Sequence, residues 1–176
     1  MRLFLGLEIP PEIVSKLDPL FFGLPGANWV KKEELHITLR FLGEINIHQM
    51  RDIDEILKDL SYPSFPVKLK SVGAFYNKRY PKVTWVGVDG DSDLLELQKK
   101  IERAIRQTLT LERKKYKPHL TLARNRDTSF QDMANYLELN SLFSAGPFEV
   151  DHFNLYSSIP TSDGPRYSIE QSYSLS

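Results

Sequence analysis

HITLRFLG, residues 36–43, is partly repeated further along the chain as HLTLAR, residues 119–124. Both stretches are rich in residues that favour strands, and in each the histidine is followed by an aliphatic residue, a threonine and a leucine. Side chains at positions i and i+2 of a strand point to the same face, so each strand should present one imidazole beside one hydroxyl. The histidines lie 119 − 36 = 83 residues apart, close to half of the 176 residues, which predicts an internal duplication with pseudo-twofold symmetry.

The segments around these motifs predict helices and strands within one domain. Runs of strand-forming residues predict strands at residues 2–9, 35–43, 65–75, 82–88, 119–124, 147–159 and 166–175. Helical spacing predicts helices at residues 45–60, 91–111 and 129–139, with a short or kinked helix within residues 13–24. The second of these helices has a cap signal in Asp91, Ser92 and Asp93. No linker separates the elements, so residues 1–176 are expected to form a single domain with two lobes.

Composition excludes several classes of protein. Lys and Arg total 23, as do Asp and Glu, so nucleic acid can be attracted only by a local basic patch. The absence of cysteine excludes disulfides, thiolate metal sites and thiol nucleophiles. The first apolar run is short and ends at Pro10 and Pro11, unlike a signal peptide, and no run approaches the ~20 residues of a membrane span. A cytoplasmic protein is expected.

The paired motifs suit the cleavage of a phosphodiester. If the two halves pack about a twofold axis, His36 and Thr38 face His119 and Thr121 across a cleft. A neutral imidazole can then take a proton from the attacking oxygen while a protonated imidazole gives one to the leaving oxygen. The ordinary histidine pKa of about 6.5 allows both forms near neutral pH. The threonine hydroxyls can donate to phosphate oxygens that gain charge in the transition state.

A single H-x-T in a strand is usually accidental, and a lone histidine is usually structural. Packing explains why a duplicated strand keeps its aliphatic residues, but it does not explain why an imidazole and a hydroxyl are kept twice. We therefore interpret His36, Thr38, His119 and Thr121 as catalytic. The four histidines of the chain lack H-x-H or H-x-x-x-H spacing, so no metal and no cofactor are expected.

An arginine lies shortly after each histidine, at Arg40 and Arg124. By strict alternation Arg40 shares the face of His36, whereas Arg124 lies opposite His119 unless a bulge or the end of the strand turns it. Alternation alone therefore favours Arg40 as the substrate-binding arginine.

These residues give the chain a resemblance to the 2H phosphoesterases, and within them to the RNA 2′,3′-cyclic phosphodiesterases, also called 2′-5′ RNA ligases. The resemblance covers nearly the whole chain. It lies in the opening MRLFLGLEIP, in NWVKKEELHITLRFLGE and YKPHLTLAR around the histidines, and in the closing LYSSIPTSDGPRYSI.

The resemblance implies an α+β fold of two lobes, with antiparallel sheets lining a central cleft and helices outside. It implies the same four catalytic residues and adds Arg124 as a contact for substrate phosphate, against the alternation argument. Phe41 matches the aromatic residue that follows the first motif, where it packs in the cleft, under a base or in the core. The implied reaction is metal-independent hydrolysis of RNA 2′,3′-cyclic phosphate ends to 2′-phosphates, together with reversible 2′-5′ RNA ligase activity through the same site.

Two other functions remain open on sequence alone: an RNA-binding module without catalysis, and a phosphodiesterase for another small cyclic nucleotide. Basic residues that would form an RNA-binding rim are Lys31, Lys32, Lys114, Lys115, Lys117 and the loop YNKRYPK, residues 76–82; such runs are often simply solvated. Tyrosines that would stack on bases are Tyr76, Tyr80 and Tyr116. We expect a monomer whose partner is RNA and which has no contact with membranes.

Overall fold

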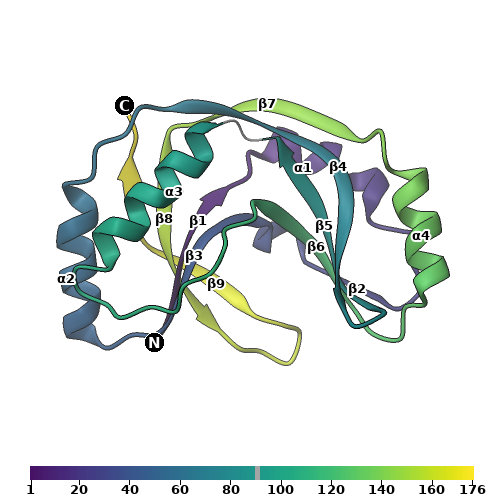
Figure 1. Ribbon diagram of the computed structural model, residues 1–176, viewed down its shortest axis with the longest axis horizontal. Helices are drawn as coiled ribbons and strands as arrows, with labels where there is room; N and C mark the ends of the chain where they lie inside the picture. Colours follow the sequence, from purple (N-terminus) through teal and green to yellow (C-terminus); the bar gives the residue numbers. More distant parts are fainter. Residues whose placement is uncertain (90–91) are drawn as a thin grey trace.

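The computed structural model describes residues 1–89 and 92–176, and Figure 1 shows how their helices and strands are arranged. The strands are β1 (Arg2–Glu8), β2 (Ala27–Trp29), β3 (His36–Glu44), β4 (Phe65–Asn77), β5 (Tyr80–Asp89), β6 (His119–Asn125), β7 (Ser144–Val150), β8 (His152–Ile159) and β9 (Arg166–Ser174). The helices are α1 (Pro11–Lys16), α2 (Ile47–Lys58), α3 (Ser92–Ile105) and α4 (Phe130–Leu139), with 3₁₀ turns at Asp18–Leu20 and Lys32–Glu34. The α+β fold class is confirmed, while the cap residue Asp91 lies outside the described residues.

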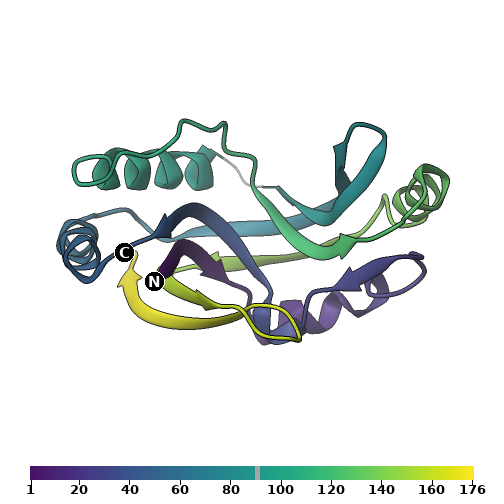
Figure 2. The same ribbon diagram turned by 90° about the horizontal axis from the view of Figure 1, so that it is seen from below.

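The strands form one antiparallel sheet in the order β7-β4-β5-β6-β3-β1-β8-β9, and β2 also pairs with β6. The two histidine strands, β3 and β6, therefore lie side by side at its centre. Four strands extend the sheet on the β3 side as β3-β1-β8-β9 and four on the β6 side as β6-β5-β4-β7. Helices α2 and α3 lie on the side of the molecule where the two termini are, and α4 lies on the opposite side (Figures 1 and 2). Each lobe therefore combines strands from both halves of the chain: β1 and β3 lie with β8 and β9, and β4 and β5 lie with β6 and β7. The origin of the lobes by duplication stays a prediction.

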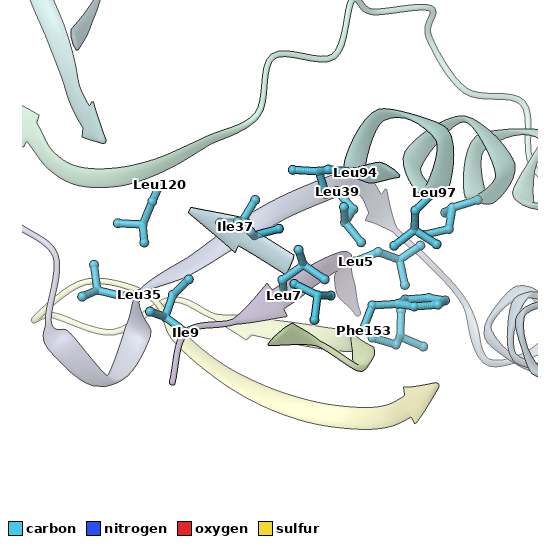
Figure 3. Close-up of a cluster of buried hydrophobic side chains, with 14 of the residues drawn as sticks. Leu5, Leu7, Ile9, Leu35, Ile37, Leu39, Leu94, Leu97, Leu120 and Phe153 are labelled. Carbon is cyan, nitrogen blue, oxygen red and sulfur yellow. The ribbon is translucent and has the colours of Figure 1, made fainter. Parts of the chain in front are cut away.

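A hydrophobic core holds the centre of the sheet together. Ile37 and Leu120 are fully buried where β3 meets β6, and the apolar face of α3 covers the neighbouring strands with Leu94 and Leu97 (Figure 3). Burying one such side chain contributes about 1.5–3 kcal/mol. The predicted helix face is confirmed at Leu94, Leu97, Ile101 and Ile105, and the helix ends at Ile105 rather than at residue 111.

Two strand predictions were wrong or incomplete. Residues 147–159 form two strands, because the chain leaves its partner β4 at Val150 and pairs with β1 after Asp151. An alternating pattern does not show where a strand changes partner. The three-residue strand β2 was not predicted, since it is too short to produce a pattern. Across the described part of the chain, no helix is both long and apolar enough to cross a membrane.

Candidate active site

The two histidine motifs meet where β3 pairs with β6. The one backbone pair between these strands joins Ile37 to Leu120 in antiparallel register. Continuing that register by one residue sets His36 opposite Thr121 and Thr38 opposite His119. Since Ile37 and Leu120 are fully buried on the core face, the four polar residues share the other face.

These four residues line a common cleft of about 790 Å³. Its wall also includes Phe41 and Arg124 from the histidine strands, Phe75 from β4 and Tyr167 from β9. The residues predicted as catalytic therefore come together, and each belongs to one of the two central strands. A volume of this size is within the usual range for small-ligand sites, about 300–1,000 Å³.

The two imidazoles are held in the same way. Nδ1 of His36 lies 2.9 Å from the carbonyl oxygen of Glu34, and Nδ1 of His119 lies 2.7 Å from that of Lys117. A carbonyl oxygen can only accept a hydrogen bond, so Nδ1 carries the proton in both rings. Nε2 of each histidine is therefore unprotonated and can take part in proton transfer, and the residue two positions earlier sets the tautomer.

The threonine of the first motif contacts the reactive nitrogen of its own histidine. The hydroxyl of Thr38 lies 2.9 Å from Nε2 of His36, and with Nδ1 protonated this hydroxyl is the donor. The side-by-side placement expected from strand alternation is thereby confirmed for this pair. Thr121 lines the same cleft beside His119.

Burial and positive charge favour the neutral form of both histidines. Burial lowers the pKa of His36, and the charges of His119 and Arg124 lower it further, against the opposing hydrogen bond to Glu34. Burial also lowers the pKa of His119, assisted by the charges of Lys117 and Arg124, against the hydrogen bond to the Lys117 carbonyl. The histidines and Arg124 therefore lie close enough to influence one another electrostatically.

A β-bulge explains how Arg124 enters the cleft. Along β6, Ala123 pairs with Thr84 but Thr121 pairs with Trp85, so Leu122 is an extra residue in the ladder. The bulge shifts the alternation by one position, which buries Ala123 and turns Arg124 to the face of His119. The prediction from strict alternation was wrong for Arg124.

A bulge at the equivalent position of β3 has the opposite effect on Arg40. Thr38 pairs with Gly6 and Arg40 with Leu5, so Leu39 is the extra residue. Phe41, 64% exposed, then faces the cleft. The prediction that Arg40 shares the face of His36 was therefore wrong.

Arg40 instead lies against helix α3. Its Nε atom is 3.3 Å from a carboxylate oxygen of Glu102, an ion pair whose geometry falls short of a hydrogen bond, and its terminal nitrogen donates to the carbonyl of Glu112. Its side chain is only 11% exposed. These contacts hold the chain that follows α3.

The sequence did not reveal two aromatic neighbours of the histidines. The ring of Tyr167 meets that of His36 edge-on with centroids 5.0 Å apart, and Phe75 meets His119 edge-on at 4.8 Å. Both aromatic residues come from strands outside the motifs. Nothing local distinguishes them from the other aromatic residues of the chain.

The basic rim is only partly assembled at the cleft. Lys31 lines it, and the ammonium of Lys117 lies 5.3 Å from the centre of the Phe75 ring in the adjoining hollow. Lys32 points elsewhere and pairs with Asp18. Of the predicted lysines, Lys31 thus lines the cleft, and Lys114, Lys115 and Lys117 line the adjoining hollow that also includes His119.

Tyr116 has a structural contact with the first motif, since its hydroxyl donates to the carbonyl of Thr38 over 2.9 Å. Tyr76 and Tyr80 are exposed near the β4–β5 turn. The stacking predicted for these three tyrosines stays a prediction.

The two remaining histidines lie outside the cleft. His48 is exposed in the first turn of α2. His152 lies between two carboxylates, with Nε2 2.7 Å from Glu8 and Nδ1 2.6 Å from Asp151. Hydrogen bonds to both carboxylates outweigh the effect of burial and raise the pKa of His152.

Curated relatives cover almost the whole chain. The chain is 34% identical to a protein of Methanocaldococcus jannaschii over 96% of its own length and 98% of that protein's length. It is also 34% identical to a protein of Archaeoglobus fulgidus, over 95% and 96% of the two lengths. Each relative is named RNA 2′,3′-cyclic phosphodiesterase.

Solved structures have the same fold. TT0787 of Thermus thermophilus matches with a TM-score of 0.81 and 25% identity, over 99% of this chain and 97% of that one. Escherichia coli LigT in its apo form matches with a TM-score of 0.80 and 22% identity, over 99% and 96% of the two chains. The model of the 2′-5′ RNA ligase superfamily matches residues 10–159. With the paired histidine motifs in one cleft, this match shows that the chain belongs to the 2′-5′ RNA ligase superfamily, among the 2H phosphoesterases.

Proposed function

We propose that this protein is an RNA 2′,3′-cyclic phosphodiesterase that opens a terminal cyclic phosphate to a 2′-phosphate. The observation that carries the proposal is the meeting of His36, Thr38, His119 and Thr121 on one face, where β3 pairs with β6. The names of the relatives support the same activity. The crystal structure of LigT complexed with 3′-AMP supports a nucleotide as the ligand of this cleft.

In the proposed reaction water attacks the cyclic phosphorus in line with the bond to the 3′ oxygen. Nε2 of one histidine accepts a proton from the water as the new P–O bond forms. The P–O3′ bond breaks, and the protonated Nε2 of the other histidine supplies the proton that the 3′ oxygen requires. Each proton transfer accelerates the reaction by about 10²–10⁴. The base and acid roles are left unassigned because both imidazoles have the same tautomer and the same type of carbonyl partner.

Charge develops on the two non-bridging phosphate oxygens as the water adds. The hydroxyls of Thr38 and Thr121 and the guanidinium of Arg124 all line the cleft. Thr121 and Arg124 can donate to these oxygens directly, and Thr38 can do so when its hydroxyl turns away from Nε2 of His36. Donors positioned for the transition state contribute about 10²–10³ each in rate. Phe41, Phe75 and Tyr167 add apolar surface to the wall of the cleft, and apolar surroundings strengthen such electrostatic interactions.

The negative charge of the bound substrate should promote protonation of the histidine that acts as the acid. Because the pKa of both histidines is lowered in the free protein, the neutral forms prevail at neutral pH. A bound phosphate carries a negative charge that opposes the charge of Arg124, and it favours a proton on one imidazole. Binding and formation of the acid are therefore coupled.

The same cleft would support 2′-5′ ligation if the 5′-hydroxyl of a second RNA end replaced water as the nucleophile. The 5′ oxygen would attack the cyclic phosphorus and lose its proton to one histidine, and the P–O3′ bond would break as the 3′ oxygen takes a proton from the other, leaving a 2′-5′ linkage. Metal independence stays a prediction, although among the described residues no three His, Asp or Glu side chains are grouped to hold a metal ion.

Product analysis tests the proposal. A short RNA ending in a 2′,3′-cyclic phosphate should be converted, with a chelator present, to an RNA ending in a 2′-phosphate only. A 3′-phosphate product would contradict the proposed geometry, and RNA binding without any product would favour a binding module. Turnover of other small cyclic nucleotides but not of RNA ends would move the proposal to a different substrate class.

A further inference from the structure

One side of the catalytic cleft opens into a second hollow. This hollow has a volume of about 720 Å³ and shares Thr38, Phe41, Phe75 and His119 with the cleft. Its outer wall is formed by the segment that connects α3 to β6. In Figure 2 this segment runs across the molecule from α3 to β6.

A third hollow continues the path over the outer side of α3. Its volume is about 730 Å³, and it shares Gln98, Lys114, Lys115 and Tyr116 with the second hollow. Because neighbouring hollows share lining residues, the three adjoin one another and together mark a path over the surface. The path begins at the histidines and ends beside Arg103 and Arg113.

Besides Arg40, seven basic residues line the second and third hollows, and we call them the basic track: Lys99, Arg103, Arg106, Arg113, Lys114, Lys115 and Lys117. The acidic residues beside it are already paired, Glu96 with Lys99, Glu102 with Arg40 and Arg106, and Glu112 with Lys114. Within the described residues, Arg113, Lys115 and Lys117 form no ion pair, and all three are exposed. In a chain of zero formal net charge this is a local positive surface.

The connecting segment is held in place by the fold. Arg106 donates to the carbonyl of Leu111 over 2.8 Å, and Arg40 donates to the carbonyl of Glu112. At its other end the Tyr116 hydroxyl is bonded to the carbonyl of Thr38, inside the first motif. The segment that carries much of the track therefore has a fixed position relative to the cleft before any ligand binds.

We propose that the basic track binds the single-stranded RNA segment that lies 5′ to the cyclic phosphate. This inference rests on the proposed function, since it takes the cyclic phosphate to lie between the histidines. The rest of the strand must then leave the cleft, and the track is a path whose charge complements a phosphate backbone. Phe41 and Phe75 stand where the cleft meets the track and offer aromatic faces to the first bases.

Calorimetry with two ligands tests the track apart from catalysis. One ligand is a tetranucleotide ending in a 2′-phosphate and the other is a nucleoside 2′-phosphate. Kd is measured for both at low and moderate salt, with the unaltered protein and with Arg113→Gln/Lys115→Gln. Both substituted residues lie outside the catalytic cleft. The control Lys78→Gln/Arg79→Gln removes the same charge near the β4–β5 turn, away from the track.

The unaltered protein should bind the tetranucleotide at least about tenfold tighter than the mononucleotide. An exposed ion pair contributes a factor of up to about five, so the track variant should bind the tetranucleotide about five- to twentyfold more weakly. The slope of log K against log salt should become shallower by ~1.4, or ~0.7 for each lost contact. Mononucleotide affinity should not change in either variant.

Equal affinity for the two ligands, or an undiminished preference in the track variant, would overturn the inference. Loss of the preference in the Lys78→Gln/Arg79→Gln control alone would also overturn it, because the strand would then cross the other lobe. Tetranucleotide binding that behaves as expected, without turnover of any cyclic phosphate, would refute the proposed function and leave the track standing.

Discussion

Arg124 and Phe41 occupy equivalent positions on the two central strands. Each lies five residues after its histidine and two residues after a bulged leucine, and both line the cleft. A β-bulge at the same position of each strand therefore places a cationic side chain of β6 and an aromatic ring of β3 in the cleft. This asymmetry gives the site a cationic side and an apolar side, although the histidines themselves are held alike.

The pH dependence of kcat/KM should report the coupling of the histidines to Arg124. The active free protein carries one proton on the pair, and because burial and charge lower the pKa of both rings, the optimum should lie below about pH 6.5. Arg124→Gln removes a positive charge, so both pKa values should rise and the optimum should move to higher pH. At the same time kcat/KM should fall by about 10²–10³.

The measurement is a pH profile of a cyclic mononucleotide substrate with both proteins. An optimum that stays in place while activity falls would show that Arg124 does not influence the histidines. An Arg124→Gln variant with full activity would exclude the proposed phosphate contact.

Replacing Arg40 should affect stability more than catalysis. Arg40→Gln removes the ion pair to Glu102 and the hydrogen bond to Glu112, and Glu102 keeps Arg106 as a partner. The free energy of unfolding should fall by about 1–3 kcal/mol, as for other partly buried polar contacts. Denaturant unfolding measures this change, and kcat/KM for a cyclic mononucleotide should stay within about threefold. A large loss of kcat/KM with unchanged stability would restore Arg40 as a substrate ligand.

His152 should stabilise the fold mainly at low pH. Burial alone would lower its pKa, but hydrogen bonds to Asp151 and Glu8 prevail and raise it. A raised pKa means that the stabilisation is complete below the unfolded value of about 6.5 and is lost as the pH rises through the folded value. The Tm difference between the unaltered protein and His152→Gln should therefore be larger at about pH 5.5 than at about pH 8.5.

The control for this experiment is His48→Gln, because His48 is exposed and forms no ion pair within the described residues. Its effect on Tm should be small at both pH values. A His152→Gln effect that grows with pH would reverse the assigned sign.

Gly26 should be needed to place β2 against β6. Its φ is +82°, and a Cβ there would lie 2.2 Å from the carbonyl oxygen of Arg126. Gly23 has a similar φ of +80° but open space around it. Gly26→Ala should therefore destabilise by at least about 1 kcal/mol more than Gly23→Ala, since only Gly26→Ala adds overpacking. Denaturant unfolding of both variants gives the comparison, and equal losses would mean that the backbone adapts freely.

The sequence predicted much of the fold because its strands and helices follow simple periods. Both histidine strands, α2 and the buried face of α3 are where apolar spacing indicated. The H-x-T spacing also indicated the face shared by His36 and Thr38, since no bulge lies within those three residues. The resemblance, and not the alternation, indicated the placement of Arg124.

The features that could not be predicted from the sequence depend on contacts between segments that are far apart in the chain. The bulges at Leu39 and Leu122 occur where the pairing register with β1 and β5 shifts by one residue. A leucine within a strand does not indicate such a shift in the sequence. Phe75 and Tyr167 reach the histidines from distant segments. The basic track likewise requires the connection after α3 to lie against the first motif, a contact made by Tyr116.

The most direct test of the account is the turnover of an RNA 2′,3′-cyclic phosphate by His36→Ala and His119→Ala, with a chelator present. Each variant should lose at least about 10² in kcat/KM, and the double variant should be little worse than either one, because the pair acts as a unit. Circular dichroism would confirm that the variants fold. Turnover at the unaltered rate in either single variant would contradict catalysis by two histidines acting across one phosphate.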